Sequence, residues 1–125
     1  MSDGVLRDQR VLILEDETLV SFLLEDMVEN LGCQLAGAYS RLDRALEAVN
    51  GGVAVDLAVL DVNVAGQQSF PLAEILAARG VPLVFATGYD ESGLPERWRG
   101  LPTLRKPFLQ EQVRVALLAA LAAQA

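Results

Sequence analysis

The sequence predicts a single α/β domain built on a doubly wound, five-stranded parallel sheet. Three observations lead to this fold class. Short apolar runs without polar alternation, such as residues 57–60, are typical of strands that are buried on both faces. Helical segments separate these runs, and the spacing between runs is too long for hairpins. Right-handed crossovers then place helices on both faces of the sheet, and 2-1-3-4-5 is a common order for five strands.

The first strand, the first helix and the second strand are expected within residues 11–39. Residues 11–14 form an apolar run with charge on both sides, which is typical of a short strand. From residue 20 to residue 31, apolar side chains recur at helical spacing, and Gly32 is expected to follow the end of this helix. Residues 34–39 are expected to form the second strand.

The second helix, the third strand and the third helix are expected in the middle of the chain. Residues 42–49 place apolar side chains on one helical face, and residues 50–52, with two glycines, end that helix. Residues 57–60 are the third strand, and they lead into a loop that contains a glycine. Pro71 is near the start of the third helix, which Gly80 ends.

Two strands and one long helix are expected in the last third of the chain. Residues 83–86 and 103–105 form the fourth and fifth strands. Between these strands, glycine and proline permit at most a short, irregular helix around residues 96–99. The last helix is expected over residues 109–122. Its inward-facing residues are expected to be Leu109, Val113, Ala116, Leu117 and Ala120.

The composition limits the function classes that need to be considered. A chain of 125 residues and 13.4 kDa suits one domain, residues 1–125, and its 52% apolar content excludes a disordered protein. The net charge of −7 and the pI near 4.4 argue against direct nucleic-acid binding. The single cysteine, Cys33, cannot form an internal disulfide and is expected to be buried. The lack of a signal segment or an apolar run that could span a membrane indicates a cytoplasmic protein.

Polar side chains follow successive predicted strands at the point where each strand ends. Glu15 and Asp16 follow the first strand. Asp61 follows the third strand, Thr87 the fourth and Lys106 the fifth. Because the carboxyl ends of parallel strands lie at one edge of a sheet, these side chains are expected to meet there. The first and third strands are neighbours in the expected order, so the three carboxylates should lie closest together.

This combination of residues indicates metal-assisted phosphoryl transfer. Carboxylates about 4 Å apart repel one another by roughly 4 kcal/mol per pair at an effective dielectric constant of 20, and a cation relieves that repulsion. Oxygen ligands without histidine or thiolate favour Mg²⁺ or Mn²⁺ over zinc. Asp61 would be the nucleophile and form an aspartyl phosphate, while Lys106 and the Thr87 hydroxyl would bind phosphoryl oxygens.

Together these features resemble the receiver domain of two-component response regulators, which has a flavodoxin-like fold. The resemblance covers nearly the whole chain. It is carried by Glu15-Asp16, by Asp61 at the end of an apolar strand with Asn63 two positions later, by Thr87 and by Lys106-Pro107-Phe108. Each feature is weak alone, but all of them in this order and at this spacing are specific.

The resemblance implies a role for each matching residue. Asp61 would be the phosphoacceptor, and Asp16 and Asp61 would bind Mg²⁺ directly. Glu15 would act on the ion through water, and the backbone carbonyl of Asn63 would complete the protein's share of the ligands. The Lys106-Pro107 peptide bond is expected to be cis, as it usually is in receivers.

A receiver would be a signalling module in a phosphorelay rather than an enzyme that turns over a metabolite. It would take a phosphoryl group from a phosphohistidine on a histidine kinase or histidine phosphotransfer protein, and it would catalyse only its own phosphorylation and dephosphorylation. The chain contains no histidine, so the donor must be another protein. Phosphorylation would then change contacts with a downstream protein. A single receiver domain without an output domain is expected, and a receiver taken from a longer regulator is the alternative.

Two departures from the usual receiver pattern affect the predicted switch. Thr103 occupies the position, three residues before the lysine, where receivers usually have an aromatic side chain. Residues 85–89, Phe-Ala-Thr-Gly-Tyr, resemble a subgroup of receivers named for a FATGY-type motif, in which free-standing receivers are common. We hypothesise that Thr87, Tyr89 and residues 90–100 carry the phosphorylation signal as a change in order. An ordinary role for Tyr89 at the rim of the site stays open.

Apolar side chains at several positions indicate contact surfaces for other proteins. The expected contact residues are Leu19, Phe22, Pro107, Leu118 and Leu121. The first three lie near the acidic pair and the lysine, where receivers dock phosphotransfer proteins. The last two project from the outer faces of the last helix, which indicates a partner or homodimer surface formed with the fifth strand. Leu19, Phe22 and Leu23 could equally belong to the core, an alternative that is favoured for Leu23.

Three other functions compete with the receiver assignment. A haloacid-dehalogenase-like phosphatase also uses an aspartate nucleophile with Mg²⁺, but that family places Asp-x-Asp after its first strand, where this chain has Glu15-Asp16-Glu17-Thr18. A nucleotide-binding α/β domain is opposed by the absence of Gly-x-x-x-x-Gly-Lys and Gly-x-Gly-x-x-Gly motifs. A receiver-like fold that has lost phosphorylation is disfavoured because every reactive position is filled.

Overall fold

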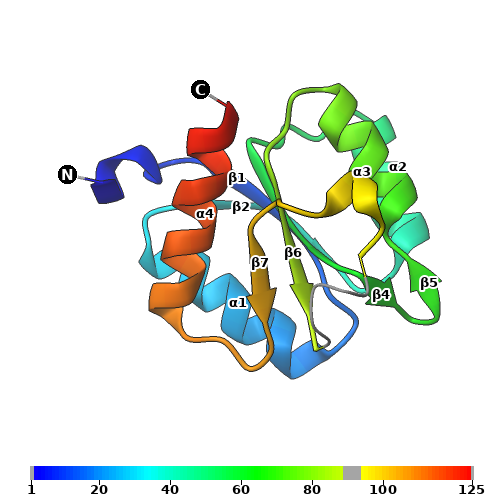
Figure 1. Ribbon diagram of the computed structural model, residues 1–125, viewed down its shortest axis with the longest axis horizontal. Coiled ribbons are helices and arrows are strands. Elements are labelled where there is room, and N and C mark those ends of the chain that lie inside the picture. The colour runs from blue at the N-terminus through cyan, green and yellow to red at the C-terminus, as the bar shows by residue number, and fades with distance from the viewer. Residues whose placement is uncertain (1, 89–93, 125) are drawn as a thin grey trace.

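A computed structural model of the chain describes residues 2–88 and 94–124, and it contains the expected five-stranded parallel sheet (Figure 1). The strands are β1 (Arg10–Leu14), β2 (Gln34–Tyr39), β3 (Leu57–Asp61), β6 (Leu83–Thr87) and β7 (Thr103–Arg105). Their order in the sheet is β2-β1-β3-β6-β7. Counted along the chain, this is the predicted order 2-1-3-4-5, and β2 and β7 are the edges.

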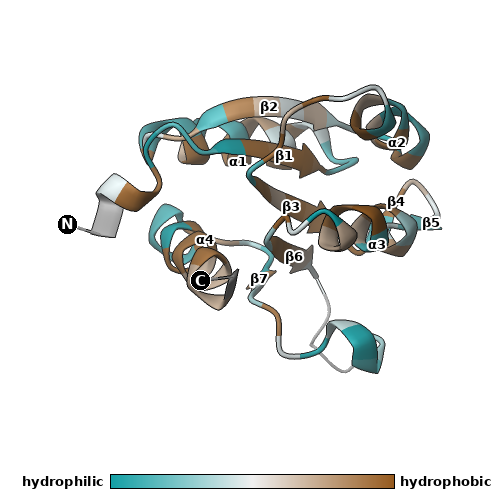
Figure 2. Ribbon diagram, turned by 90° about the horizontal axis from the view of Figure 1, so that it is seen from above, coloured by the Kyte–Doolittle hydropathy of each residue, from teal (hydrophilic) through white to brown (hydrophobic). Residues whose placement is uncertain are grey.

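Two pairs of helices cover the two faces of the sheet (Figures 1 and 2). Helices α1 (Thr18–Asn30) and α4 (Gln110–Gln124) pack on one face. Helices α2 (Leu42–Asn50) and α3 (Phe70–Ala78) pack on the other. The predicted flavodoxin-like architecture is confirmed. Among the described residues, no helix has the length and hydropathy that a membrane span requires.

Alternate residues of the central strands β1, β3 and β6 belong to two separate hydrophobic clusters. In β1, Val11 and Ile13 belong to the cluster beneath α1 and α4, whereas Leu12 and Leu14 belong to the cluster beneath α2 and α3. Every residue of β3 and β6 is buried. A strand buried on both faces has no solvent-facing position, which explains the uninterrupted apolar runs in the sequence. Cys33 is buried in the first cluster, as predicted, and burial raises the pKa of its thiol to about 11.

The ends of α1 and α3 follow the glycine signals in the sequence. Gly32 and Gly80 follow the last turns of these helices. Their φ angles of +93° and +77° are in the left-handed region, which residues with a side chain rarely adopt. The Gly32 carbonyl accepts a hydrogen bond of 2.8 Å from the backbone N–H of Asp8. This bond ties the N-terminal segment to α1. That segment contains a 3₁₀ turn, η1 (Ser2–Val5), which the sequence does not predict, and the fully buried Leu6.

Two connections show structure that the sequence predicts only in part. After β3 the chain forms a small antiparallel hairpin, β4 (Asn63–Val64) and β5 (Gln67–Gln68), where the sequence predicts a plain loop. Between β6 and β7, the described residues contain a 3₁₀ turn, η3 (Glu96–Trp98), in agreement with the expected short, irregular helix. Both connections leave the sheet at the edge where the predicted site lies.

Two side chains that are predicted to be buried are exposed. Leu109 precedes α4, and its backbone N–H donates a hydrogen bond of 2.7 Å to Gln112 Oε1. Leu109 therefore lies at the exposed start of α4 and does not reach the core. Leu23 in α1 is half-exposed, because Leu24 and Val28 take the inward-facing positions of this helix. Both predictions are wrong because periodicity marks an apolar face without fixing the rotation of the helix on the sheet.

An aromatic cluster joins β6, α3 and η3. Phe85 is fully buried, and its ring centroid lies 6.0 Å from that of Phe70 and 5.7 Å from that of Trp98, in edge-to-face geometry. The rings of Phe70 and Trp98 stack with centroids 6.4 Å apart. Aromatic pairs at such distances contribute stability beyond the burial of their area. The cluster therefore holds η3 against the sheet, and it contains the chain's one tryptophan.

Phe85→Ala is expected to lower the free energy of unfolding by about 3–5 kcal/mol, because it removes a buried ring and leaves a cavity. Trp98 loses an edge-to-face neighbour, so its emission maximum should move to longer wavelength. Urea denaturation followed by circular dichroism measures the first effect, and fluorescence of the folded protein measures the second. Val84→Ala, which alters the other face of β6, is the control. Equal emission shifts in the two variants would contradict the proposed role of the cluster.

Candidate functional site

The polar side chains that are predicted to meet at one edge of the sheet do so. Glu15 directly follows β1, Asp61 ends β3, Thr87 ends β6 and Lys106 follows β7. These strands are neighbours in parallel register, and the pairing continues to the last residues, with Asp61 opposite Ala86. The strand ends therefore stand side by side at the carboxyl edge of the sheet.

Three carboxylates form a compact cluster of oxygen atoms at this edge. Glu15, Asp16 and Asp61 each offer one oxygen, and these oxygens lie within 4.8 Å of one another. Glu15 and Asp61 are buried, whereas Asp16 is exposed. The donor set is oxygen alone and the separation suits one hard cation, so these residues fit Mg²⁺ or Mn²⁺.

The ammonium group of Lys106 balances part of this negative charge. Its Nζ lies 2.7 Å from Glu15 Oε1 and 3.0 Å from Asp61 Oδ2. The backbone also holds this residue, because the Lys106 N–H donates a hydrogen bond of 3.0 Å to the carbonyl of Thr87. The peptide bond between Lys106 and Pro107 is cis, as the resemblance predicts. Main chain and side chain together direct the ammonium group at Asp61.

The pKa values of Asp61 and Lys106 are both raised. Burial raises the pKa of Asp61 to about 6; the hydrogen bond from Lys106 opposes this rise, and repulsion from Glu15 adds to it. Burial alone would lower the pKa of Lys106, but its hydrogen bonds and ion pairs with Glu15 and Asp61 outweigh burial and raise it. At neutral pH the cluster therefore holds an ammonium cation beside a desolvated carboxylate.

The hairpin after β3 orients Asp16. The backbone N–H of Ala65 donates a hydrogen bond of 2.9 Å to Asp16 Oδ2. Ala65 and Gly66, at the turn, have φ of +49° and +83°, the left-handed pair that a tight two-residue hairpin turn requires. Val64 is fully buried and anchors the hairpin. The sequence does not reveal this contact, because Ala-Gly is a weaker turn signal than Asn-Gly.

Glu17 is a second residue of the site that the sequence analysis does not identify. Its Oε1 lies 3.3 Å from Lys106 Nζ. It is the N-cap residue of α1, and its backbone N–H donates a hydrogen bond of 2.9 Å to Glu15 Oε2. The available signal is its place in the acidic run directly after Asp16.

A cavity of about 410 Å³ adjoins the carboxylate cluster. It is lined by Glu17, Asp61, Val62, Asn63, Thr87, Gly88 and Lys106. The cavity brings together four of the predicted site residues. Among them Asn63 is exposed and Thr87 is buried. Tyr89, which is also predicted to take part in the switch, lies outside the described residues.

A second, apolar cavity of about 320 Å³ lies beside the first. It is lined by Glu17, Val20, Leu23, Met27, Lys106, Pro107 and Phe108. Leu19 and Phe22 are 70% and 63% exposed on the same helix, α1. The predicted contact residues near the acidic pair are therefore accessible at the surface.

The other predicted contact residues are placed differently. Leu118 and Leu121 are half-buried and pack against the hydrophobic cluster beneath α4, rather than projecting away from it. Val115 is the large exposed apolar side chain of α4. The outer face of α4 is therefore less apolar than the sequence predicts.

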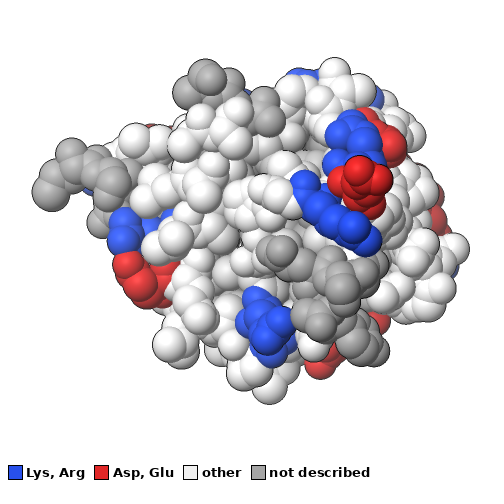
Figure 3. All heavy atoms as spheres, in the orientation of Figure 1, with Lys and Arg blue, Asp and Glu red and all other residues white. Residues whose placement is uncertain are grey.

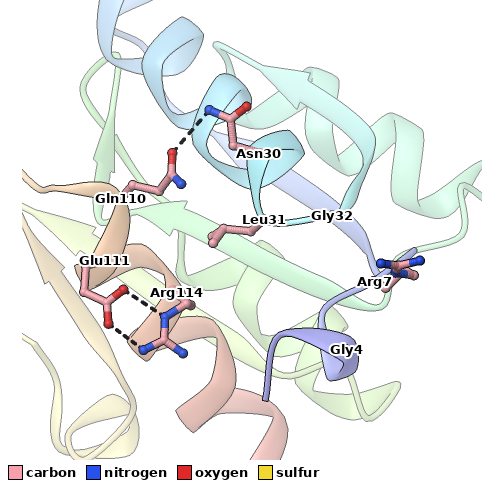
Figure 4. Close-up of a pocket in the computed structure, with 8 residues that line it drawn as sticks. All are labelled: Gly4, Arg7, Asn30, Leu31, Gly32, Gln110, Glu111 and Arg114. Atoms are coloured by element: carbon pink, nitrogen blue, oxygen red, sulfur yellow. Dashed lines mark hydrogen bonds and ion pairs between the residues drawn. The ribbon is translucent and has the colours of Figure 1, made fainter. Parts of the chain in front are cut away.

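A cavity of about 760 Å³ lies away from the carboxylate cluster, where the N-terminal segment, the end of α1 and the start of α4 meet (Figure 4). Asn30 donates a hydrogen bond to Gln110 here, and Arg114 pairs with Glu111. Among the described residues that line this cavity, none is a predicted site residue. It is therefore separate from the candidate site.

Curated proteins with similar sequences are regulators, while no family model matches the chain. The phyllosphere-induced regulator PhyR of Methylorubrum extorquens is 30% identical over 114 residues, which are 89% of this chain and 43% of PhyR. The transcriptional regulatory protein PdtaR of Mycobacterium tuberculosis is 32% identical over 104 residues, which are 80% of this chain and 50% of PdtaR. The chain spans about half the length of these curated relatives or less.

Solved structures match over most of both chains. The solution structure of SdrG from Sphingomonas melonis Fr1 has a TM-score of 0.82 and 43% identity, covering 91% of this chain and 97% of SdrG. The REC domain of the response regulator PhyR from Erythrobacter litoralis has a TM-score of 0.82 and 33% identity, covering 95% of this chain and 94% of that domain. A BeF3-activated conformation of SdrG has a TM-score of 0.77 and 42% identity, with 90% and 95% covered.

Asp61→Asn is expected to stabilise the metal-free protein at pH 7 by up to about 3 kcal/mol, the equivalent of a pKa raised from 3.8 to about 6. The carboxyl group of Asp61 binds its proton more tightly in the folded protein than in the unfolded chain. Ionisation of Asp61 therefore lowers the free energy of unfolding as pH rises from about 4 to about 6, a loss that the variant avoids. Urea denaturation at pH 4, 5, 6 and 7 without divalent cations measures the difference.

Asp56→Asn is the control with the opposite sign. The hydrogen bond from Arg10 lowers the pKa of Asp56, so its charged form stabilises the fold above the unfolded pKa, and this contribution is lost as pH falls. The Asp56 variant should therefore lose stability at pH 7. A similar loss of stability in Asp61→Asn would show that burial of the ionised Asp61 carboxylate does not destabilise the folded protein.

Proposed function

The chain belongs to the response regulator receiver family, and on this premise we propose that it acts in a phosphorelay by accepting a phosphoryl group on Asp61. The observation that carries the proposal is the contact of 3.0 Å between Asp61 Oδ2 and Lys106 Nζ, beside the carboxylates of Glu15 and Asp16. The phosphatase alternative is not favoured, because the relatives are regulators.

In the proposed reaction, an oxygen of Asp61 attacks the phosphorus of a phosphohistidine. The new O–P bond forms as the P–N bond breaks, and the electron pair of the broken bond stays on the imidazole nitrogen. Lys106 would bind a phosphoryl oxygen, since its ammonium already lies at hydrogen-bond distance from Asp61. Thr87 lines the same cavity, and its hydroxyl would bind another phosphoryl oxygen.

We propose that Asp16 and Asp61 hold Mg²⁺ or Mn²⁺ directly, that Glu15 acts through water, and that the Asn63 carbonyl completes the protein ligands. Bound Mg²⁺ would neutralise charge between Asp61 and the incoming phosphoryl group. The Ala65 amide engages one oxygen of Asp16, which leaves the other oxygen for the ion. The direct ion pair between Glu15 and Lys106 supports an indirect role for Glu15.

The phosphodonor is proposed to be a histidine kinase or a histidine phosphotransfer protein. The phosphorylated chain would then pass the signal to a downstream protein. The sequence Phe-Ala-Thr-Gly-Tyr at residues 85–89 supports the FATGY-type subgroup. With Thr103 at the usual aromatic position, the signal would be carried by Thr87, Tyr89 and the segment after them.

Two surfaces are proposed for protein contacts. The α1 surface, formed by Leu19, Phe22 and the apolar cavity at Pro107, would dock the phosphodonor. The α4–β7 surface combines the edge strand β7 with the exposed Val115, around a cavity of about 540 Å³. Figure 3 shows that most atoms on this face of the molecule belong to uncharged residues, and that groups of opposite charge lie against one another at the upper right and at the left of the view. It would contact the downstream protein or a second copy of the chain.

Beryllofluoride with Mg²⁺ is expected to bind at Asp61 as a phosphoryl mimic and to change the fluorescence of Trp98. The reason is that η3, which contains Trp98, lies on the connection between Thr87 and β7. Asp61→Asn should weaken the response at least tenfold, while Glu111→Gln, in the separate cavity of Figure 4, should respond normally. A fluorescence titration measures this, and an unchanged response in Asp61→Asn would refute the assignment of the phosphoacceptor.

Leu19→Ser combined with Phe22→Ser is expected to slow phosphotransfer from a phosphohistidine protein at least tenfold, because it removes apolar contact area from the docking surface. Phosphorylation by acetyl phosphate should stay within twofold, since a small donor needs no docking surface. The donor is found by testing the histidine kinases and histidine phosphotransfer proteins of the source organism. Phosphotransfer is followed with radiolabelled phosphate. Val115→Ser is the matched control, and an equal loss in that variant would count against the α1 surface.

A further inference from the structure

Glu17 differs from the other two carboxylates that contact Lys106. Its side chain is 65% exposed, against 2% for Glu15 and 8% for Asp61. It is also the most distant of the three, at 3.3 Å from Nζ against 2.7 Å and 3.0 Å. The exposed Glu17 carboxylate stays well solvated, which weakens its ion pair with the largely buried Lys106. Glu17 can therefore leave Lys106 more easily than the two buried carboxylates can.

Glu17 also stands between the two neighbouring cavities. It lines the cavity that contains Asp61 and Thr87, and it lines the apolar cavity that contains Val20 and Phe108. Lys106 is the other residue common to both. A donor that reaches Asp61 from the α1 surface therefore passes Glu17.

The charge around the proposed phosphoacceptor is strongly negative. The formal charges of the four carboxylates Glu15, Asp16, Glu17 and Asp61 and of the Lys106 ammonium group sum to −3. A divalent cation would reduce this to −1. A free phosphoanion is repelled by the remaining negative charge, and it finds one contact of Lys106 already occupied by Glu17.

We infer that Glu17 is a specificity-determining residue that slows phosphorylation of Asp61 by free phosphoanions. The inference rests on the proposed function of Asp61 as the phosphoacceptor. Glu17 acts by occupying Lys106 and by adding a negative charge at the mouth of the cavity. A protein donor gains apolar contacts on the α1 surface that offset this repulsion, whereas a small anion makes no such contacts.

The test compares two small phosphodonors of different charge, acetyl phosphate and phosphoramidate, on the full chain with Mg²⁺. With acetyl phosphate, an oxygen of Asp61 forms the new O–P bond while the bond from phosphorus to acetate breaks, and acetate leaves with the electron pair. Glu17→Gln is expected to raise this rate about three- to tenfold at 0.1 M ionic strength, as measured by mass spectrometry. The gain should shrink at 1 M, where the Debye length falls from about 10 Å to about 3 Å. It should be smaller with phosphoramidate, which carries less negative charge.

Glu29→Gln is the matched control, because Glu29 lies twelve residues further along α1, or roughly 18 Å along the helix axis. Its rates should equal those of the unaltered protein. An unchanged or lower rate in Glu17→Gln, a gain that is independent of salt, or an equal gain in Glu29→Gln would overturn the inference while leaving the proposed function intact. If neither donor phosphorylates Asp61 in any variant and beryllofluoride has no effect, the proposed function fails as well. Thermal unfolding of each variant establishes that it is folded.

Discussion

The ion pairs of Lys106 with Glu15 and Asp61 are the interaction on which the site depends. Glu15 and Asp61 are buried, and a buried charge without a partner costs several kcal/mol. The three side chains come from the ends of β1, β3 and β7, so they can pair only if these strands finish at the same edge of the sheet. Lys106 must reach across β6 to Asp61, and the hydrogen bond from its backbone to Thr87 supports that reach.

The hydrophobic core keeps these strand ends in place. Alternate residues of the strands enter two separate clusters, and the four α-helices of the described chain close the clusters from both sides (Figure 2). Polar groups then concentrate where the strands leave the sheet. Burial raises the pKa of Asp61 to about 6, so the folded protein holds this carboxylate in a position that opposes its ionisation. Such a position is a cost to stability that a reactive site commonly carries.

The surroundings of the site suit a reaction between two proteins. Exposed apolar side chains on α1 and the apolar cavity at Pro107 lie directly beside the cavity of Asp61 and Thr87. Glu17 stands at the boundary, in contact with the ammonium group of Lys106 that also pairs with Asp61. Under the proposed function, recognition of a partner and access to Asp61 would therefore involve the same short stretch of chain at the start of α1.

The sequence by itself determined the sheet, its strand order and the meeting of Asp61 with Asp16 and Lys106. Apolar runs reveal strands that are buried on both faces, and parallel strands bring their carboxyl ends to one edge. The resemblance to receivers added the cis bond before Pro107, which the structure contains.

Only the tertiary structure decided the contacts that depend on loop conformation and helix rotation. The hydrogen bond between Ala65 and Asp16 joins residues 49 positions apart, and the contact between Lys106 and Glu17 joins residues 89 apart. The packing of each helix against the sheet likewise decides that Leu23 is half-exposed and that Leu118 is half-buried. Periodicity shows which residues share a face, whereas the packing of that face against the sheet sets how deeply each side chain is buried.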